Sequence, residues 1–319
     1  MVNSANSDIS ATSPVAVIDL GSNTVLLLVI EHGGRVLRDV ANITRLAQGV
    51  FDSGVLDPDA KGRTLSAARD FAGIARELGA ERVVGVGTEA LRRAHDGARL
   101  LSELRAEGVL DESYLLSGQQ EAELAIETSR RTRGEKRQPL VVIDVGGGST
   151  EVAWTEGEER VHGTSLPLGS VRLTEAHVRS HPVPPGELAE LRDAVDRASR
   201  ALEGVCGLGR DGDVVAVAGT ATTLAALELR LAAYAPDAVE GYELSRETLE
   251  RWISDLSQLG VEERRRLPGL EPGRADVIVA GLVILEGVLA RISAQSFRVS
   301  GRGVRYGVAF RLLEGRSPV

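Results

Sequence analysis

The sequence predicts an α/β protein made of two copies of one domain, each a mixed five-stranded sheet with helical connections. The first reason is that VIDLGSNT at residues 17–24 recurs as VIDVGGGST at residues 142–150. The second is that three landmarks follow in the same order in both halves: an amphipathic helical segment, a strand ending in Gly-Thr and a strand ending in Ser-Gly. This ordered recurrence indicates an internal duplication.

Each half can be assigned element by element. An apolar strand ends at Asp19 or Asp144, and a glycine-rich turn and a second apolar strand follow it. A third strand-like run comes next, and then a segment with apolar residues at helical spacing and proline near its start. The last two strands, VVGVGT and YLLSG or VVAVAGT and FRVSG, follow with helical connections. Such connections require crossovers, so each sheet should be mixed.

The predicted organisation has three parts. Residues 1–13 are expected to be a disordered lead-in, residues 14–133 the first domain and residues 134–319 the second domain. The second domain carries a mostly helical insertion at about 222–295. The charged segment SRRTRGEKRQP at 129–139 is predicted to be an exposed link between the domains.

Composition excludes several classes of protein. The chain of 319 residues is 43% hydrophobic and 26% charged, which is typical of a soluble globular protein. It contains neither an apolar run long enough to span a membrane nor a signal peptide, so we expect no membrane association. A single cysteine, Cys206, favours a reducing cytoplasm. The net charge of −9 argues against nucleic-acid binding.

The duplicated turns predict a phosphate site in a cleft between the domains. Glycines at 21, 146, 147 and 148 allow consecutive backbone N–H groups to point at one centre, and such a nest binds phosphate oxygens. The hydroxyl groups of Ser22, Thr24, Ser149 and Thr150 could add hydrogen bonds.

Carboxylates beside these turns predict a divalent cation. Asp19 and Asp144 would repel a bound phosphate unless a cation lay between them, which indicates Mg²⁺ or Mn²⁺. The histidines show no zinc-site spacing. The alternative is that both aspartates only stabilise turns. Glu121 in SGQQEAEL could likewise cap a helix or act on water, and spacing leaves both open.

The motifs together resemble the exopolyphosphatase/guanosine pentaphosphate phosphohydrolase family of the actin–hexokinase–chaperone ATPase superfamily. The resemblance runs from about Val15 to Leu313 and rests on VIDLGSNT, GTEALRRA, LSGQQEAEL, VIDVGGGSTEV, SLPLGSVRLTE, AVAGTATTLAAL, PGRADVIVAGLVILEGVL and VSGRGVRYGV. It implies two ribonuclease H-like (actin-like ATPase) domains with the active site in the cleft between them.

The resemblance also implies residue roles. Glu121 would be the base that activates water, Arg92 a phosphate contact, and Asp144 and Glu151 metal and catalytic residues. The implied phosphate-binding residues are Gly146, Gly147, Gly148 and Ser149 in the main loop and Gly21, Ser22 and Asn23 opposite. From their positions in the duplication, we also expect Asp19 to be a metal ligand and Thr220 to bind phosphate.

The sequence differs from the usual pattern of the family in three respects. Thr24 stands where many members have serine, and Leu26 stands where many have arginine. The chain also resembles the short, two-domain class, because no further helical domain follows Leu313.

We therefore expect an exopolyphosphatase that hydrolyses the terminal phosphate of inorganic polyphosphate with Mg²⁺ or Mn²⁺. A guanosine pentaphosphate 5′-phosphohydrolase would use the same machinery. Two alternative hypotheses assign a different class of function: an ATP-dependent phosphotransferase, or a sensor that binds polyphosphate or an alarmone. A homodimer is compatible with the sequence.

Overall fold

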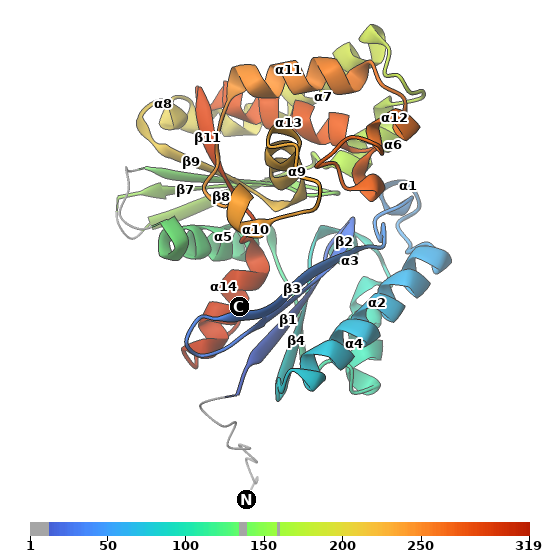
Figure 1. Ribbon diagram of the computed structural model, residues 1–319, viewed down its shortest axis with the longest axis vertical. Helices are drawn as coiled ribbons and strands as arrows, with labels where there is room; N and C mark the ends of the chain where they lie inside the picture. Colours follow the sequence, from blue (N-terminus) through green and yellow to red (C-terminus); the bar gives the residue numbers. More distant parts are fainter. Residues whose placement is uncertain (1–12, 134–138, 158–159) are drawn as a thin grey trace, which may run out of the picture.

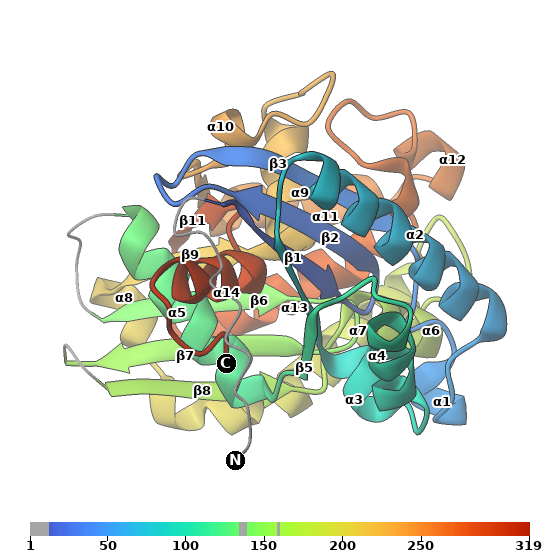
Figure 2. The same ribbon diagram turned by 90° about the horizontal axis from the view of Figure 1, so that it is seen from below.

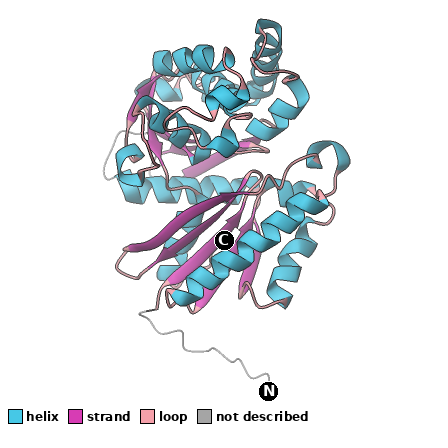
Figure 3. Ribbon diagram, turned by 45° about the vertical axis from the view of Figure 1, so that its right-hand side comes forward, coloured by secondary structure: helices cyan, strands magenta, loops and turns pink. Residues whose placement is uncertain are grey.

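The computed structural model describes residues 13–133, 139–157 and 160–319 (Figure 1). The predicted disordered lead-in falls almost wholly outside these residues, and so does the central part of the predicted link. Two mixed sheets, each with helices, lie one above the other (Figures 1 and 3), which confirms the predicted duplicated fold class.

The first sheet has five strands in the order β3-β2-β1-β4-β5. β1, β2 and β3 pair antiparallel, whereas β1, β4 and β5 pair parallel. The strands are β1 (Val15–Leu20), β2 (Thr24–Ile30), β3 (Val36–Ile43), β4 (Arg82–Gly87) and β5 (Glu112–Leu115).

The second sheet repeats this arrangement and adds a strand. Its order is β10-β11-β9-β6-β7-β8, so it has six strands where we expected five. The strands are β6 (Leu140–Val145), β7 (Thr150–Glu156), β8 (Arg160–Leu166), β9 (Asp213–Val217), β10 (Glu243–Ser245) and β11 (Ser296–Ser300). β10 lies inside the predicted helical insertion and pairs antiparallel with β11. At three residues it is too short for alternation of apolar and polar residues to reveal it.

Helices connect the strands and cover the sheets. They are α1 (Val50–Ser53), α2 (Pro58–Glu77), α3 (Glu89–Arg93), α4 (Gly97–Ala106), α5 (Gly118–Arg133), α6 (Ser170–His177), α7 (Pro185–Ser199), η1 (Arg200–Val205), α8 (Leu208–Asp211), α9 (Ala218–Glu228), α10 (Pro236–Val239), α11 (Arg246–Ser257), α12 (Val261–Arg264), η2 (Pro272–Arg274), α13 (Ile278–Arg291) and α14 (Val304–Leu313).

Local sequence explains where α2 begins and why α13 is deeply buried. Asp57 caps α2 by accepting the Ala60 N–H at 2.8 Å, and Pro58 occupies the first turn, where its missing N–H costs nothing. α13 is apolar on almost every side and is the central buried helix of the second half. Among the described residues, no helix combines the length and the apolar character needed to cross a membrane.

The last helix of each half packs against the sheet of the other half. α5 places Ala122, Ala125 and Ile126 on the second sheet, and α14 places Val308 and Leu312 on the first. The two helices pack against each other (Figure 2), and a Cβ on Gly307 would come within 2.8 Å of the Leu124 carbonyl oxygen. The exchange brings Glu121, at the start of α5, between the two sheets.

Candidate active site

A cleft of about 1080 Å³ lies between the two halves, at the ends of β1 and β6. It is lined by Asp19, Gly21, Ser22, Asn23, Glu121, Asp144, Gly146, Gly147, Gly148, Ser149 and Glu151, all of which the sequence singled out. The side chains of Arg92 and Thr220 lie outside this lining.

The two glycine turns have the same internal geometry. The Gly21 N–H donates to the Thr24 carbonyl at 3.1 Å, and the Gly146 N–H donates to the Ser149 carbonyl at 3.0 Å. These hydrogen bonds span the same number of residues at equivalent places in the two hairpins. The duplication therefore extends to the backbone of the turns.

The turns also face each other closely. A Cβ on Gly147 would lie 3.0 Å from Ser22 Cβ, and one on Gly148 would lie 2.6 Å from the Phe51 ring and 2.9 Å from Ser22 Oγ. Larger residues at these positions would push the turns apart, because a Cβ atom essentially never lies within 3.0 Å of an atom outside its own and the adjoining residues. The glycines are thus required for the close approach of the two halves.

Strand register places a second carboxylate in one half only. Asp144 pairs across β6 and β7 with Glu151, whereas Asp19 pairs across β1 and β2 with Leu26. Opposite residues on neighbouring strands point to the same face of a sheet. The second half therefore contributes a carboxylate pair to the cleft, and the first half contributes one carboxylate beside an apolar side chain.

Burial makes these carboxylates costly to ionise. It raises the pKa of Asp144 to about 8, an effect that Glu151 and Asp19 reinforce and Arg305 opposes. It raises the pKa of Asp19 to about 6, again opposed by Arg305. Burial also raises the pKa of Glu151, against the hydrogen bonds that it accepts from Ser149 at 2.7 Å and Ser165 at 2.8 Å.

Several buried polar atoms beside the turns have no hydrogen-bond partner among the residues that the structure describes. They include Asp19 Oδ1 and both terminal atoms of the Asn23 side chain. Buried polar atoms are nearly always paired in native proteins. The unpaired oxygens suit a hard cation, and the unpaired Asn23 Nδ2 group suits a phosphate oxygen, to which it can donate.

Glu121 is held at the wall of the cleft by an arginine. It is 5% exposed and lies in the first turn of α5. Arg92 in α3 donates to the Glu121 carboxylate and the Leu116 carbonyl, and its other terminal nitrogen donates to Glu89 Oε2 at 2.8 Å. Burial, with a smaller contribution from Glu151, raises the pKa of Glu121, while Arg92 opposes the shift. Arg92 therefore contacts carboxylates here, where the resemblance implied a phosphate contact.

Thr220 has a structural contact. Its hydroxyl donates to the Val145 carbonyl at 3.3 Å and lies beside Gly281 of α13. Its neighbours in the sequence, Ala218 and Gly219, do line the cleft at the beginning of α9.

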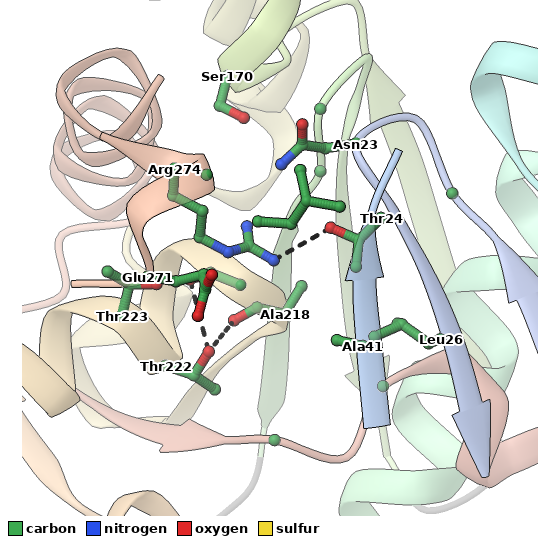
Figure 4. Close-up of a pocket in the computed structure, with 18 of the residues that line it drawn as sticks. Asn23, Thr24, Leu26, Ala41, Ser170, Ala218, Thr222, Thr223, Glu271 and Arg274 are labelled. Carbon is green, nitrogen blue, oxygen red and sulfur yellow. Dashed lines mark hydrogen bonds between the residues drawn. The ribbon is translucent and has the colours of Figure 1, made fainter. Parts of the chain in front are cut away.

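Arg274 is a further positively charged residue in the cleft, and the sequence analysis assigned no role to it. It lies in the insertion and reaches the cleft beside Gly219, and its guanidinium donates to Thr24 Oγ1 at 3.3 Å (Figure 4). Its motif PGRADV contributed to the resemblance, but nothing local in that motif shows that the side chain crosses to the first half. Arg305 also lines the cleft; it is 9% exposed and pairs with Asp39 of β3 at 2.9 Å.

Two halves of actin-like architecture, with facing glycine turns and buried carboxylates between them, define a phosphate-handling enzyme of the actin-like two-domain class. The sequence profile described as the Ppx/GppA phosphatase family matches residues 29–315. The chain belongs to this family.

Named relatives agree with this assignment. Exopolyphosphatase 2 of Mycobacterium tuberculosis is 33% identical over 95% of this chain and 99% of that protein. The crystal structure of the Aquifex aeolicus Ppx/GppA family member superposes with a TM-score of 0.77 at 30% identity, over 95% of this chain and 99% of that one. Guanosine-5′-triphosphate,3′-diphosphate pyrophosphatase of Vibrio cholerae is 28% identical over 96% of this chain, which spans only 60% of that longer protein.

Proposed function

We propose that this protein is an exopolyphosphatase that removes the terminal phosphate of inorganic polyphosphate. The observation that carries the proposal is Glu121, a buried carboxylate oriented by Arg92 at the wall of a cleft lined by two glycine turns. A positioned carboxylate beside a phosphate nest is the arrangement that hydrolysis needs. The relatives named exopolyphosphatase, similar over nearly their full length, support the same substrate.

The proposed reaction uses the two turns to hold the terminal phosphate. Backbone N–H groups of residues 146–148 and 21–23 would donate to its oxygens and stabilise the charge that develops during attack. Glu121 would accept a proton from water as the water oxygen bonds to phosphorus. The bridging phosphoanhydride P–O bond breaks, and the shortened polyphosphate leaves with that electron pair.

Arg92 has a positioning role in this proposal. Its contacts with Glu121, Glu89 and the Leu116 carbonyl hold the Glu121 carboxylate in one orientation. A general base acts only within hydrogen-bonding reach of the proton that it accepts, so orientation matters as much as pKa.

Asp144, Glu151 and Asp19 would hold Mg²⁺ or Mn²⁺. Within residues 13–133, 139–157 and 160–319, no group of three or more His, Cys, Asp or Glu side chains is arranged to hold a metal ion by itself. Mg²⁺ usually takes only one or two protein carboxylates and completes its coordination shell with phosphate oxygens and water. When bound, the cation would neutralise charge on the phosphate group.

Guanosine pentaphosphate is the second candidate substrate, because the Vibrio cholerae relative is named for it. An apolar part of the cleft, which includes Leu26, Val40 and Leu231, offers a surface against which a group other than phosphate could pack. The phosphate chemistry would be unchanged. A cytoplasmic location and a homodimer stay predictions of the sequence.

One assay tests the proposal. Phosphate release is measured with Mg²⁺ from short polyphosphate, long polyphosphate, guanosine pentaphosphate and ATP. We expect the highest kcat/KM for a polyphosphate. A higher value for guanosine pentaphosphate would establish the second candidate instead, and no release from any of the four would refute hydrolase function.

A further inference from the structure

A short segment of the insertion crosses from the second half to the first. Residues 271–276, here called the strap, lie between α12 and α13 and include η2. At Gly273 the strap lies directly on the end of β3, since a Cβ there would come within 2.6 Å of Ile43 Cδ1. The strap therefore passes over the cleft at the edge of the first sheet.

The strap brings Arg274 into the cleft. A Cβ on Gly219 would overlap the Arg274 guanidinium, so this flat group lies on bare backbone at the beginning of α9. Its one side-chain hydrogen bond in the described part of the chain is to the Thr24 hydroxyl, at 3.3 Å (Figure 4). A guanidinium in this position has donors left for an anion between the two turns.

Arg45 of the first half fixes the strap in place. Its guanidinium forms a two-pronged ion pair with Asp276 at 2.7 and 2.8 Å and donates to the Gly273 carbonyl at 3.1 Å. Its own N–H donates to the Asn23 carbonyl at 3.0 Å, within the first glycine turn. One residue therefore connects a phosphate-binding turn with the segment that carries Arg274.

The backbone of Arg45 supports a specific role. Its φ is 56°, in the left-handed region that residues other than glycine enter at a cost. Such conformations persist where the surroundings impose them, and they are common at functional sites. The ion pair is also partly exposed, with side chains 34% and 25% accessible, so it adds little to global stability. Positioning the strap is a function that such a pair performs well, because the planar fork fixes direction.

We propose that Arg45 is a positioning residue that, through Asp276, holds the strap so that Arg274 faces the phosphates bound between the two turns. The proposal rests on the proposed function for the identity of the substrate. Its geometry can be tested whether or not that substrate is correct.

The test compares Arg45→Ala, Arg45→Lys, Asp276→Ala and the charge exchange Arg45→Asp with Asp276→Arg. Arg69→Ala is the matched control, because Arg69 forms a similar two-pronged pair with Glu107 at 2.9 Å on the outer surface of the first half. Two readouts are taken: steady-state kinetics on sodium tripolyphosphate, and the rate of trypsin cleavage after Arg274. Cleavage after exposed Arg265 and Arg266 of the same chain serves as the internal reference.

We expect Arg45→Ala and Asp276→Ala to raise KM about tenfold and to change kcat less than about threefold, since the contact they weaken is one charge-assisted hydrogen bond to the bound anion. Cleavage after Arg274 should accelerate relative to the internal reference. Arg45→Lys should be intermediate because it keeps the charge and loses the fork, and the charge exchange should recover part of the loss.

The two measurements distinguish a failure of the substrate proposal from a failure of the positioning proposal. If the wild type releases no phosphate from tripolyphosphate, the substrate proposal fails, and protease protection alone decides the role of Arg45. If both alanine variants match Arg69→Ala in KM and in cleavage, the positioning role is wrong. A fall in kcat at unchanged KM would also overturn it, because it would place Arg45 in the chemical step.

Discussion

Leu26 and Glu151 occupy equivalent positions in the two halves of the molecule. Each faces an aspartate across a strand pair, Asp19 in the first half and Asp144 in the second. A duplicated fold thus presents two similar glycine turns with different side chains beside them. The turns can share the task of holding phosphate, whereas only the second half contributes two carboxylates that face each other across a strand pair.

Replacing Glu121 tests the proposed base. Glu121→Gln keeps the shape of the side chain and removes the proton acceptor, so we expect kcat to fall roughly 10²- to 10⁴-fold with the melting temperature preserved. The control is Glu123→Gln, on the same helix, whose carboxylate bonds to Gln119 at 2.9 Å. Turnover of Glu121→Gln close to that of the control would remove Glu121 from the mechanism.

Replacing Asp144 tests the cation site through stability as well as activity. Asp144→Asn removes a buried carboxylate whose ionisation burial and Glu151 oppose, so the variant in EDTA should melt about 2 °C or more above the wild type. Mg²⁺ should stabilise the wild type and not the variant, because a ligand stabilises only a fold that binds it. EDTA should abolish wild-type activity, and Mg²⁺ or Mn²⁺ should restore it.

The control for this comparison is Asp193→Asn, at an exposed position of α7. It should show the wild-type response to Mg²⁺. Equal stabilisation of Asp144→Asn and Asp193→Asn by Mg²⁺, or full wild-type activity in EDTA, would contradict the assignment.

Within the insertion, one buried arginine connects several helices and loops. Arg264 at the end of α12 is 0% exposed and donates to the Leu256 carbonyl at 2.8 Å and the Ala275 carbonyl at 3.0 Å. It also contacts His181 Nδ1 at 3.1 Å. Burial lowers its pKa to about 10, so it stays charged at neutral pH. Arg264 thereby joins α11, α12 and the strap within the second half.

Replacing Arg264 should lower the free energy of unfolding. Arg264→Met removes the side-chain hydrogen bonds to two carbonyls in a buried site, and we expect a loss of roughly 3 kcal/mol in the free energy of unfolding. Urea unfolding measures the change. The neighbouring Arg265→Met, at an exposed position, should stay within about 0.5 kcal/mol of wild type. Equal stability of the two variants would show that the buried hydrogen bonds of Arg264 do not hold the insertion together.

The whole molecule is closed across the cleft by contacts between its halves. Besides the Arg45–Asp276 pair, Arg305 pairs with Asp39 at 2.9 Å, and the Arg172 guanidinium lies 5.0 Å from the centre of the Phe51 ring. The crossed helices α5 and α14 join the halves on the other side. Substrate has to enter a space that contacts restrict on several sides, which favours a short anion.

Chain-length preference follows from this geometry and from charge. The net charge is −9, and Arg274 and Arg305 lie within the cleft, where they can serve only the phosphates nearest the reaction. A long track would need basic surface beyond the cleft, because each added phosphate binds mainly by electrostatic attraction. We therefore expect preference for short polyphosphate and distributive release. Gel electrophoresis of a partial digest should show many intermediate lengths, whereas full-length chains and free phosphate with nothing between them would mean processive action.

Much of the fold and part of the site could be predicted because their determinants are local. The repeated turns, Asp19 and Asp144 lie within or beside strands whose apolar pattern continues to the turn, so order along the chain was enough to find them. Glu121 was a candidate from its motif, while its role as the base and the choice of Glu151 came from the family resemblance; the cleft brings both residues together with the turns. The added strand β10 was missed because three residues carry no periodic signal.

By itself the sequence determined the duplication, the facing glycine turns and the acidic residues beside them, since these depend on short-range pattern and on the freedom of glycine. Only the tertiary structure decided that α5 and α14 exchange sheets, that Arg92 orients Glu121, and that the strap carries Arg274 to the cleft. The reason is distance along the chain. Arg45 and Asp276 are 231 residues apart, and a contact over such a separation leaves no periodicity or spacing in the sequence from which it could be inferred.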